Sequence, residues 1–220
     1  MNVCVLIPSY NEELTIGGVV KRIKDMGLEV IIVDDGSTDK TEEAASKYGA
    51  LVLRNIKNMG KGAALREGFD FILKAAKYDA VIVMDADGQH NPDDIGKFVS
   101  RLADHGDDII VGNRMAHPKN MPFVRLATNR FMSYLLSAIC KQEIPDTQCG
   151  FKLIKCKVLK ELRLEANNFD FDSEILITAS RRHFKIASVP VDTIYTGELS
   201  YINPLKDTLR FIRLLLKMRK

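Results

Sequence analysis

The chain has 220 residues, of which 46% are hydrophobic and 28% charged, the usual composition of a globular protein with a sizeable core. The formal net charge is only +3, and residues 203–220 hold six basic residues and one acid, so a strongly anionic partner would meet this segment rather than the whole chain. The sequence contains no CxxC pair, no leader peptide and no apolar run of roughly 18 residues, which argues against a zinc or disulfide framework, a signal peptide and a membrane span.

Short apolar runs alternate with helical patterns through the first half of the chain. Apolar residues at helical spacing predict helices over residues 12–26, 38–48 and 61–76. Strands are predicted over residues 3–7, 30–33, 51–53, 80–84 and 109–111, and later over 186–191. Because these strand runs are continuously apolar, both faces of their sheet should be covered. The predicted fold class is α/β, with a mostly parallel sheet flanked by helices.

Beyond residue 112 the regular alternation stops. Residues 117–122 predict a loop, residues 125–140 a helix, and residues 161–183 contain a further helix. Residues 204–220 predict an amphipathic helix with basic residues around its apolar stripe, suited either to an anionic membrane surface or to packing on the core. We therefore predict a single catalytic domain over residues 1–202, followed by a C-terminal helix, residues 203–220, that is not a separate domain.

Polar clusters follow three of the predicted strands. They are "PSYNEE" at residues 8–13, "VDDGSTD" at residues 33–39 and "DADGQHNPDD" at residues 85–94. Ligands of open α/β sheets bind beyond the carboxyl ends of the strands, so the three clusters should share one rim. Each cluster alone also fits a helix cap or a turn, with Asn11, Ser37 or Thr38 as the capping residue.

Asp85 and Asp87 provide the strongest chemical indication. Side chains two residues apart on a strand point to the same face, so both carboxylates can converge on one point. Mg²⁺ and Mn²⁺ prefer such oxygen ligands and share them with phosphates, and Gln89 could add an amide oxygen. The glycine-rich stretch from Asn58 to Gly68 lacks the spacing of phosphate and dinucleotide loops, which excludes those classes. Its Lys61 fits a solvated helix start or a phosphate contact.

Six motifs in order resemble the family 2 inverting glycosyltransferases of the GT-A, Rossmann-like fold. They are PSYNEE, VDDGSTD, NxGKGAALREG, DADGQH, GNR at residues 112–114 and DTQCGFK at residues 146–152. The most similar branch is that of polyprenyl-phosphate transferases, including dolichol-phosphate mannosyl- and glucosyltransferases. The resemblance implies a metal-dependent enzyme that uses Mg²⁺ or Mn²⁺. It would move glucose or mannose from a UDP- or GDP-linked sugar to a polyprenyl or dolichyl phosphate.

The resemblance also implies a location and partners. The protein would be cytoplasmic and peripheral at the cytosolic membrane face, in contact with the membrane surface or a membrane-spanning partner subunit, and with no nucleic acid. One segment departs from the mannosyltransferase pattern: Thr196 and Tyr201 stand where those relatives carry an Arg and a Lys. This difference weakens the case for mannose.

The site residues follow from the same resemblance. The nucleotide sugar would be bound by Pro8, Tyr10, Glu12, Asp35, Lys61, Asp85, Ala86 and Asp87, and the metal by Asp85, Asp87 and Gln89. Asp85, Asp87 and Arg114 form the predicted catalytic set. The acceptor phosphate would meet Arg114, Arg125, Lys206 and Arg210, with Asp146, Gln148 and Lys152 at the floor of the site.

The acceptor class decides whether a general base is needed. A phosphate monoester is already largely anionic at neutral pH, because its second pKa is about 6, so positioning and charge neutralisation suffice. A saccharide hydroxyl acceptor, the main alternative, would require Asp172 or Glu174 as a base; otherwise these two residues orient arginines or cap a helix. A second alternative is a non-catalytic nucleotide-sugar-binding protein.

Overall fold

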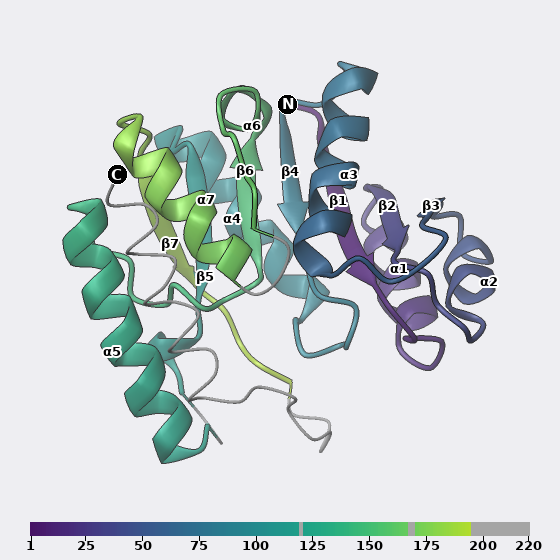
Figure 1. Ribbon diagram of the computed structural model, residues 1–220, viewed down its shortest axis with the longest axis horizontal. Helices are drawn as coiled ribbons and strands as arrows, with labels where there is room; N and C mark the ends of the chain where they lie inside the picture. Colours follow the sequence, from purple (N-terminus) through teal and green to yellow (C-terminus); the bar gives the residue numbers. More distant parts are fainter. Residues whose placement is uncertain (119–120, 167–169, 195–220) are drawn as a thin grey trace.

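A computed structural model describes residues 1–118, 121–166 and 170–194 (Figure 1). Within these residues one sheet has the strand order β3-β2-β1-β4-β6-β5-β7. All neighbouring strands are parallel except β6, which is antiparallel to both β4 and β5. The strands are β1 (Val3–Ser9), β2 (Glu29–Asp34), β3 (Leu51–Arg54), β4 (Ala80–Val83), β5 (Ile109–Asn113), β6 (Lys152–Lys155) and β7 (Ile186–Pro190).

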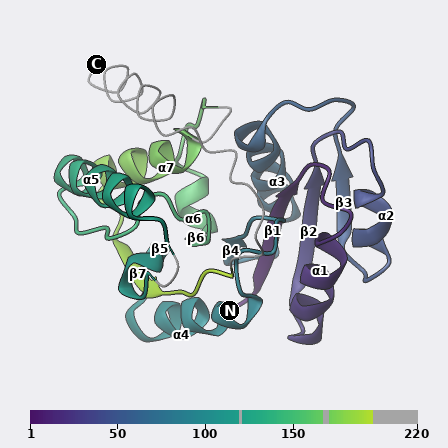
Figure 2. The same ribbon diagram turned by 90° about the horizontal axis from the view of Figure 1, so that it is seen from below.

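Helices cover both faces of the sheet, as Figure 2 shows. One face carries α3 (Lys61–Ala75), α5 (Phe123–Cys140), α6 (Cys156–Leu159) and α7 (Asp170–Arg181). The other carries α1 (Ile16–Asp25) and α4 (Ile95–His105), with α2 (Thr41–Ser46) packed on α1. Two short 3₁₀ helices are η1 (Pro92–Asp94) and η2 (Arg114–Ala116). The predicted α/β fold class, with a mostly parallel sheet flanked by helices, is confirmed.

The centre of the sheet is buried because its strands are apolar on both sides. All seven residues of β1 are buried, and α3 lies directly over this strand. Gly68 allows that close approach: a Cβ at this position would stand 2.4 Å from Leu6 Cδ1. The tight contact fixes the start of α3 relative to the end of β1, where the polar clusters lie.

The structure corrects several predicted boundaries. The first helix starts at Ile16 rather than at residue 12, because residues 10–15 form a loop in which Asn11 has a φ of 55°. The sequence prediction missed β6. Its four residues, Lys-Leu-Ile-Lys, place only two apolar side chains between two lysines. The prediction also gave no range for α4. The predicted amphipathic helix and the domain boundary after residue 202 lie outside the described residues.

None of the helices in the described part of the chain combines the length and the apolar character needed to span a bilayer.

Candidate functional site

A cavity of about 220 Å³ opens at the carboxyl ends of β1, β2 and β4. The chain passes from β1 to β2 on one side and places β4 on the other, so the cavity lies at a topological switch point, where α/β sheets bind ligands. All eight residues predicted to bind the nucleotide sugar line it, together with three that were not predicted. The lining residues are Pro8, Ser9, Tyr10, Glu12, Asp35, Asn58, Lys61, Ala64, Asp85, Ala86 and Asp87.

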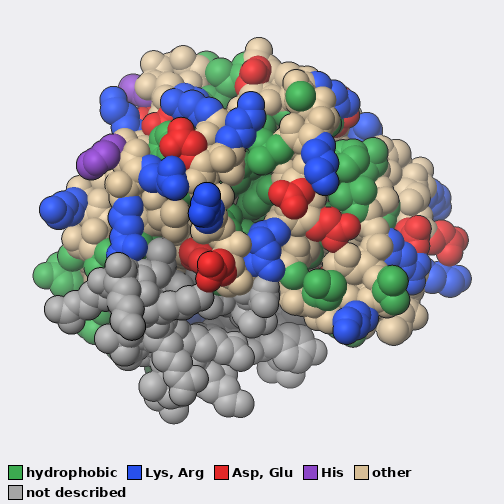
Figure 3. Space-filling view, turned by 45° about the horizontal axis from the view of Figure 1, so that its top comes forward, with side chains coloured by type: hydrophobic (Ala, Val, Ile, Leu, Met, Phe, Trp, Pro, Cys, Tyr) green, Lys and Arg blue, Asp and Glu red, His purple; other side chains and the backbone are tan. Residues whose placement is uncertain are grey.

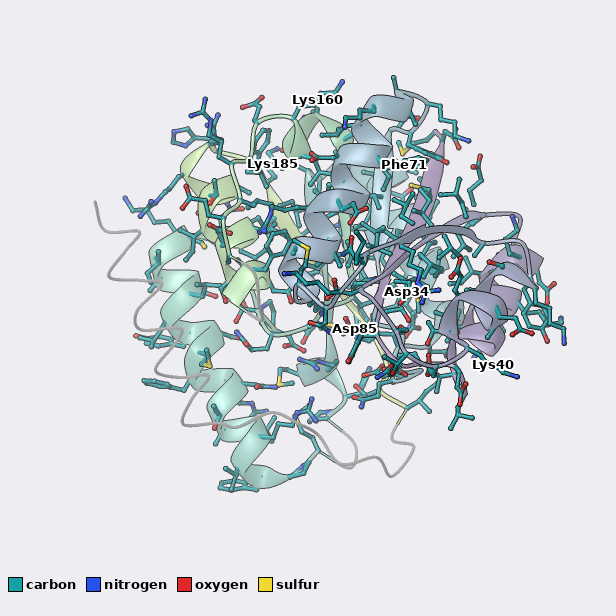
Figure 4. The ribbon with its side chains drawn as sticks, turned by 45° about the vertical axis from the view of Figure 1, so that its right-hand side comes forward. Asp34, Lys40, Phe71, Asp85, Lys160 and Lys185 are labelled. Carbon is teal, nitrogen blue, oxygen red and sulfur yellow. The ribbon has the colours of Figure 1, made fainter. Side chains whose placement is uncertain are left out.

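A second cavity, of about 480 Å³, lies at the opposite end of the sheet and includes Met1 and Lys160. Figure 4 shows Asp34 and Asp85 toward one end of the strands and Lys160 and Lys185 toward the other. One lysine of this cavity, Lys157, is paired with Asp108 at 2.7 Å. On the face drawn in Figure 3, basic side chains are interspersed with acidic ones. Position at the carboxyl ends therefore favours the smaller cavity as the site.

Hydrogen bonds join the loops that follow β1 and β2. The Asn11 backbone N–H donates to Ser37 Oγ at 2.9 Å, and the Thr38 N–H donates to Asn11 Oδ1 at 2.9 Å. Asn11 is therefore a bridge between two loops rather than the helix cap considered from sequence. Farther along, the Thr15 hydroxyl donates to the Ala86 carbonyl at 2.8 Å, which ties the start of α1 to the loop after β4. The three predicted polar clusters thus form one connected rim.

Asp35 organises the loop that leads into α3. Its carboxylate accepts hydrogen bonds from Asn55 Nδ2 at 2.8 Å, from the Met59 N–H at 3.0 Å and from the Gly60 N–H at 2.7 Å. These bonds hold the residues immediately before Lys61, so Asp35 fixes where the lysine enters the cavity. Its predicted contact with a nucleoside remains a prediction.

A row of alternating charges runs under the cavity. Lys152 Nζ lies 2.6 Å from Asp172 Oδ1, and Asp172 Oδ2 lies 3.7 Å from Lys61 Nζ. Lys61 Nζ in turn donates to Asp85 Oδ1 at 2.5 Å. Lys152 is 1% exposed and also donates to the Cys149 carbonyl. Side-chain charges from α3, from β6, from α7 and from the loop after β4 therefore meet here.

Pairing keeps both groups that face the cavity in their charged forms. Burial alone would raise the pKa of Asp85, but the nearby ammonium of Lys61 outweighs it and holds this pKa well below its usual range. Burial alone would lower the pKa of Lys61, but the carboxylates of Asp85 and Asp172 raise it above its usual value. Neighbouring His90 is different, because burial lowers its pKa to about 4. The imidazole is thus neutral at neutral pH, and its Nδ1 accepts the Asp85 N–H at 3.2 Å.

The two acids are placed by a loop, which corrects the strand argument made from sequence. β4 ends at Val83, so Asp85 and Asp87 lie beyond the pleat. The Gln89 N–H donates to Asp87 Oδ1 at 2.9 Å, and Gly88, with a φ of 71°, turns the chain between them. Both acids border the cavity because the loop bends, and not because strand residues alternate.

The residues around the two acids fit a hard cation that is shared with a phosphate ligand. Among the described residues, no group of three or more His, Cys, Asp and Glu side chains is arranged to hold a metal by itself. Two ionised carboxylates on one cavity are nevertheless the donor set that Mg²⁺ and Mn²⁺ use when phosphate oxygens complete the shell. Gly150 leaves room for the Asp85 carboxylate, because a Cβ at position 150 would stand 2.5 Å from Asp85 Oδ2. Gln89 is not one of the described residues that line the cavity.

The predicted acceptor residues have different surroundings. Arg114 is buried, and its Nε and Nη2 donate to the Asp146 carboxylate at 2.7 and 2.9 Å. Arg125 lies in the first turn of α5 and is half-buried. Lys206 and Arg210 fall outside the described residues. Of the two predicted phosphate contacts that the structure describes, Arg114 is therefore the one that a buried carboxylate already orients.

The two predicted base candidates are both engaged within the protein. Glu174 accepts hydrogen bonds from the backbone N–H groups of Glu165 and Ala166, at 3.0 and 2.9 Å to the same oxygen. Asp172 is paired with Lys152 and Lys61, and these two ammonium groups outweigh its burial and lower its pKa. The partners of Asp172 are lysines and those of Glu174 are backbone N–H groups, whereas the sequence suggested arginines or a helix cap, and a role as base stays a prediction.

Sequence reasoning missed several residues that shape the site. Ser9, Asn58 and Ala64 line the cavity, His90 supports the Asp85 backbone, and Gly150 makes room for the Asp85 carboxylate. Asn58 and His90 stand inside motifs already quoted, so their positions were available. Gly150 also stands inside a quoted motif, DTQCGFK, but its contact with Asp85 could not be read from the motif, because the two residues are 65 positions apart in the sequence.

Comparisons with known proteins agree on one family. The family described as Glycosyl transferase family 2 matches residues 4–163. A UDP-N-acetylglucosamine–dolichyl-phosphate N-acetylglucosaminyltransferase of Methanococcus voltae is 31% identical over 87% of this chain and 85% of that protein. A dolichol-phosphate mannosyltransferase of Pyrococcus furiosus is 32% identical, over 86% of this chain but 56% of that protein.

A solved structure is similar over almost the whole chain. Glucosyl-3-phosphoglycerate synthase from Mycobacterium tuberculosis, crystallised with phosphoglyceric acid, superposes with a TM-score of 0.76. The match covers 98% of this chain and 79% of that one, at 23% sequence identity. At this level of identity the similarity establishes the arrangement of strands and helices.

Proposed function

Since the chain belongs to glycosyl transferase family 2, we propose that it transfers a hexose, glucose or mannose, from a UDP- or GDP-linked sugar to a polyprenyl or dolichyl phosphate. It is a glycosyltransferase with the GT-A fold expected from its motifs. The names of two relatives support the lipid acceptor, because both are described as acting on dolichyl or dolichol phosphate. Such an acceptor would bring the enzyme to a membrane surface or to a membrane-spanning partner.

One observation carries the donor half of this proposal. The cavity at the topological switch point is bordered by all three strand-end motifs, and Asp85, Ala86 and Asp87 form one of its sides. Tyr10, which is 45% exposed, offers a ring to a nucleoside, and Glu12 lies on the same rim. The carboxylates of Asp85 and Asp87 would hold the divalent cation, with Gln89 as the predicted third ligand.

The charges of the site suit loss of a nucleoside diphosphate. A bound divalent ion supplies positive charge where negative charge develops on the leaving phosphates. Lys61 provides a second positive charge at the same cavity, and its Nζ lies 3.7 Å from Asp172 Oδ2. The chain's own part in catalysis would be to fix these charges before the donor arrives, so that no rearrangement is needed during transfer.

The engaged carboxylates favour a phosphate acceptor over a hydroxyl. The ammonium groups beside Asp172 lower its pKa and so oppose uptake of a proton, and Glu174 is engaged by backbone N–H groups. A phosphate monoester needs no such base, because it is already anionic. Arg114, oriented by Asp146, and Arg125 are the described residues that we propose for the acceptor phosphate, with Lys206 and Arg210 outside the described part.

Transfer of labelled sugar tests this proposal. The full chain would be incubated with Mg²⁺ or Mn²⁺, a polyprenyl phosphate and radiolabelled UDP-glucose, GDP-mannose or UDP-N-acetylglucosamine, the last because of the Methanococcus relative. With labelled glucose or mannose as the donor sugar, we expect label in the lipid fraction, in a form that mild acid releases. The Asp87→Asn variant should incorporate much less label. Label only in water-soluble glycan would instead support the saccharide acceptor. Donor binding without any transfer would support the non-catalytic alternative.

A further inference from the structure

Helix α5 exposes several large apolar side chains. In the 18-residue helix, five large apolar side chains are exposed by 41 to 82%: Phe123, Val124, Phe131, Tyr134 and Ile139. At 100° per residue, Phe123, Val124, Phe131 and Tyr134 share one side, over a helix length of about 17 Å. We call these four residues the outer stripe of α5. Burying a Phe or Tyr side chain stabilises a folded protein, so a row of such exposed rings requires an explanation.

The opposite side of α5 is buried and partly polar. Its buried residues are Asn129, Met132, Ser133, Leu136 and Cys140, and the helix packs on α7. Ser133 Oγ accepts the Thr147 N–H at 2.9 Å, so this side has its polar partners inside the protein. α5 therefore carries apolar side chains on both its inward and its outward side, whereas surface helices usually keep them on the inward side. Both ribbon views place it at the edge of the molecule, where its outer side has no neighbouring helix or strand among the described residues (Figures 1 and 2).

The stretch of sequence that carries the outer stripe lacks acidic residues. Residues 109–142 contain no Asp or Glu, whereas they contain Arg114, Lys119, Arg125, Arg130 and Lys141. Arg130 and Lys141 are exposed and lie at the border of the outer stripe, while Arg125 is half-buried. An apolar stripe with Phe and Tyr rings and a basic border matches the interface of an anionic bilayer, where rings enter the headgroup region and each Lys or Arg adds about 1 kcal/mol.

We propose that the outer stripe of α5 lies in the interface of a membrane that contains anionic lipids. The inference rests on the proposed function for its biological setting, since a lipid-linked acceptor phosphate must be reached from a membrane surface. The same acid-free stretch leads from Arg114 at the end of β5 directly into α5. Docking through this helix would therefore present the predicted acceptor residues to the bilayer.

Sedimentation with lipid vesicles tests the proposal on the full chain. Vesicles of phosphatidylcholine alone and of phosphatidylcholine with phosphatidylserine would be compared, using wild type and the double variant Phe131→Glu with Tyr134→Glu. The matched control is Leu51→Glu with Ile56→Glu, two exposed apolar residues at the β3 end of the sheet. We expect wild type and control to sediment with anionic vesicles, and to do so more weakly at high salt. The α5 variant should bind these vesicles with an affinity at least about tenfold lower.

Several outcomes would overturn the inference. Vesicle binding by the α5 variant equal to wild type would mean that another segment, such as residues 195–220, makes the contact. A wild-type dimer that the α5 variant converts to a monomer, measured by light scattering, would identify the stripe as a contact between copies. If the Glu variant fails to fold by circular dichroism, Phe131→Ser with Tyr134→Ser replaces it under the same criteria.

A second readout separates this inference from the proposed enzyme activity. In detergent solution the α5 variant should transfer sugar to polyprenyl phosphate at the wild-type rate, whereas acceptor embedded in anionic vesicles should be used at least several-fold more slowly. Transfer equally fast in vesicles would contradict docking through α5. Absence of transfer by wild type in both settings would contradict the proposed function, and vesicle sedimentation would still decide the membrane contact.

Discussion

Lys61 lies between the carboxylates of Asp85 and Asp172. Its ammonium keeps them charged, and it also competes with a cation that would bind to Asp85. Its ammonium is 2.5 Å from Asp85 Oδ1, one of the oxygens that we propose for the divalent ion. A cation arriving at Asp85 meets a positive charge already present there. The ammonium therefore weakens binding of the ion alone, whereas a diphosphate arriving with the ion brings negative charge that Lys61 can attract. This arrangement couples metal binding to donor binding.

Replacing Lys61 by Met should tighten Mn²⁺ binding in the absence of nucleotide by about tenfold or more, because two unit charges about 4 Å apart near a protein surface interact by about 4 kcal/mol. The concentration of free Mn²⁺, measured by electron paramagnetic resonance, gives the affinity directly. Lys74→Met is the matched control, since Lys74 is exposed near the other end of the same helix. Unchanged or weaker Mn²⁺ binding by Lys61→Met would contradict a cation site on Asp85.

Asp172 illustrates how a buried pair links stability to pH. Burial opposes its ionisation, but Lys152 and Lys61 lower its pKa below the ordinary value of 3.8. The folded state therefore binds this proton less readily than the unfolded state does. The stabilisation from the carboxylate is fully present above about pH 4 and is lost as the pH falls through the folded-state pKa.

Asp172→Asn should lower the free energy of unfolding at neutral pH by about 3 to 5 kcal/mol, because it leaves the buried Lys152 without its partner. Below about pH 4 the difference from wild type should shrink, because the unfolded wild-type chain then binds a proton that the folded state takes up only at lower pH. Urea unfolding at neutral pH and near pH 3 measures both effects. Asp25→Asn, which breaks the exposed pair with Lys21, should change stability by less than about 1 kcal/mol at either pH.

At the scale of elements, the approach of the β6 segment to the loop after β4 decides the shape of the site. β6 inserts antiparallel between β4 and β5, and Gly150 just before it faces Asp85. A side chain at position 150 would occupy the space of the carboxylate, with Cβ 2.5 Å from Asp85 Oδ2. The geometry of Asp85 thus depends on a strand that joins the sheet about 70 residues later in the chain.

Gly150→Ala should therefore reduce sugar transfer strongly, by about 10²-fold if the displacement removes one charged contact in the transition state. Steady-state transfer of labelled sugar gives the rate, and nucleotide-dependent thermal stabilisation shows whether the donor still binds. The control is Gly18→Ala on α1, where a Cβ meets nothing within 4 Å and should stabilise the helix by about 0.5 to 1 kcal/mol. A Gly150→Ala enzyme with wild-type turnover would show that Asp85 can shift without consequence.

At the scale of the whole molecule, the four cysteines report on the integrity of the core. Cys4, Cys140, Cys149 and Cys156 are free and buried in different parts of the fold. Burial raises the pKa of Cys4 to about 12 and that of Cys149 to about 11, so little thiolate forms at ordinary pH. Burial of these thiols and their small thiolate fraction therefore both slow their reaction with reagents in solution.

Native protein should react with Ellman's reagent only as fast as it unfolds, and should release four equivalents of thiol only in denaturant. Absorbance during the reaction at mildly alkaline pH, with and without urea, provides the measurement. Rapid stoichiometric reaction of even one thiol in the native state would show that this part of the core opens easily.

The sequence by itself determined the fold class, most of the elements, the residues of the rim and the family. Continuous apolar runs such as residues 3–7 and 80–84 can be buried on both faces only in a covered sheet, so the α/β class followed from local patterns. The resemblance of the motifs to the glycosyltransferase family implied all eight predicted donor residues, and each lies on the cavity. Strand periodicity and motif order are local properties, which is why they could be read without coordinates.

Only the tertiary structure decided how these residues act on one another. The pairs Lys152–Asp172, Lys61–Asp85 and Arg114–Asp146 join positions 20 to 32 residues apart, and Gly150 meets Asp85 across a strand inserted between β4 and β5. The outward orientation of α5 likewise depends on which side α7 covers. Charge pairing and burial are set by distances in space, and a sequence fixes those distances only once the sheet has brought distant segments together.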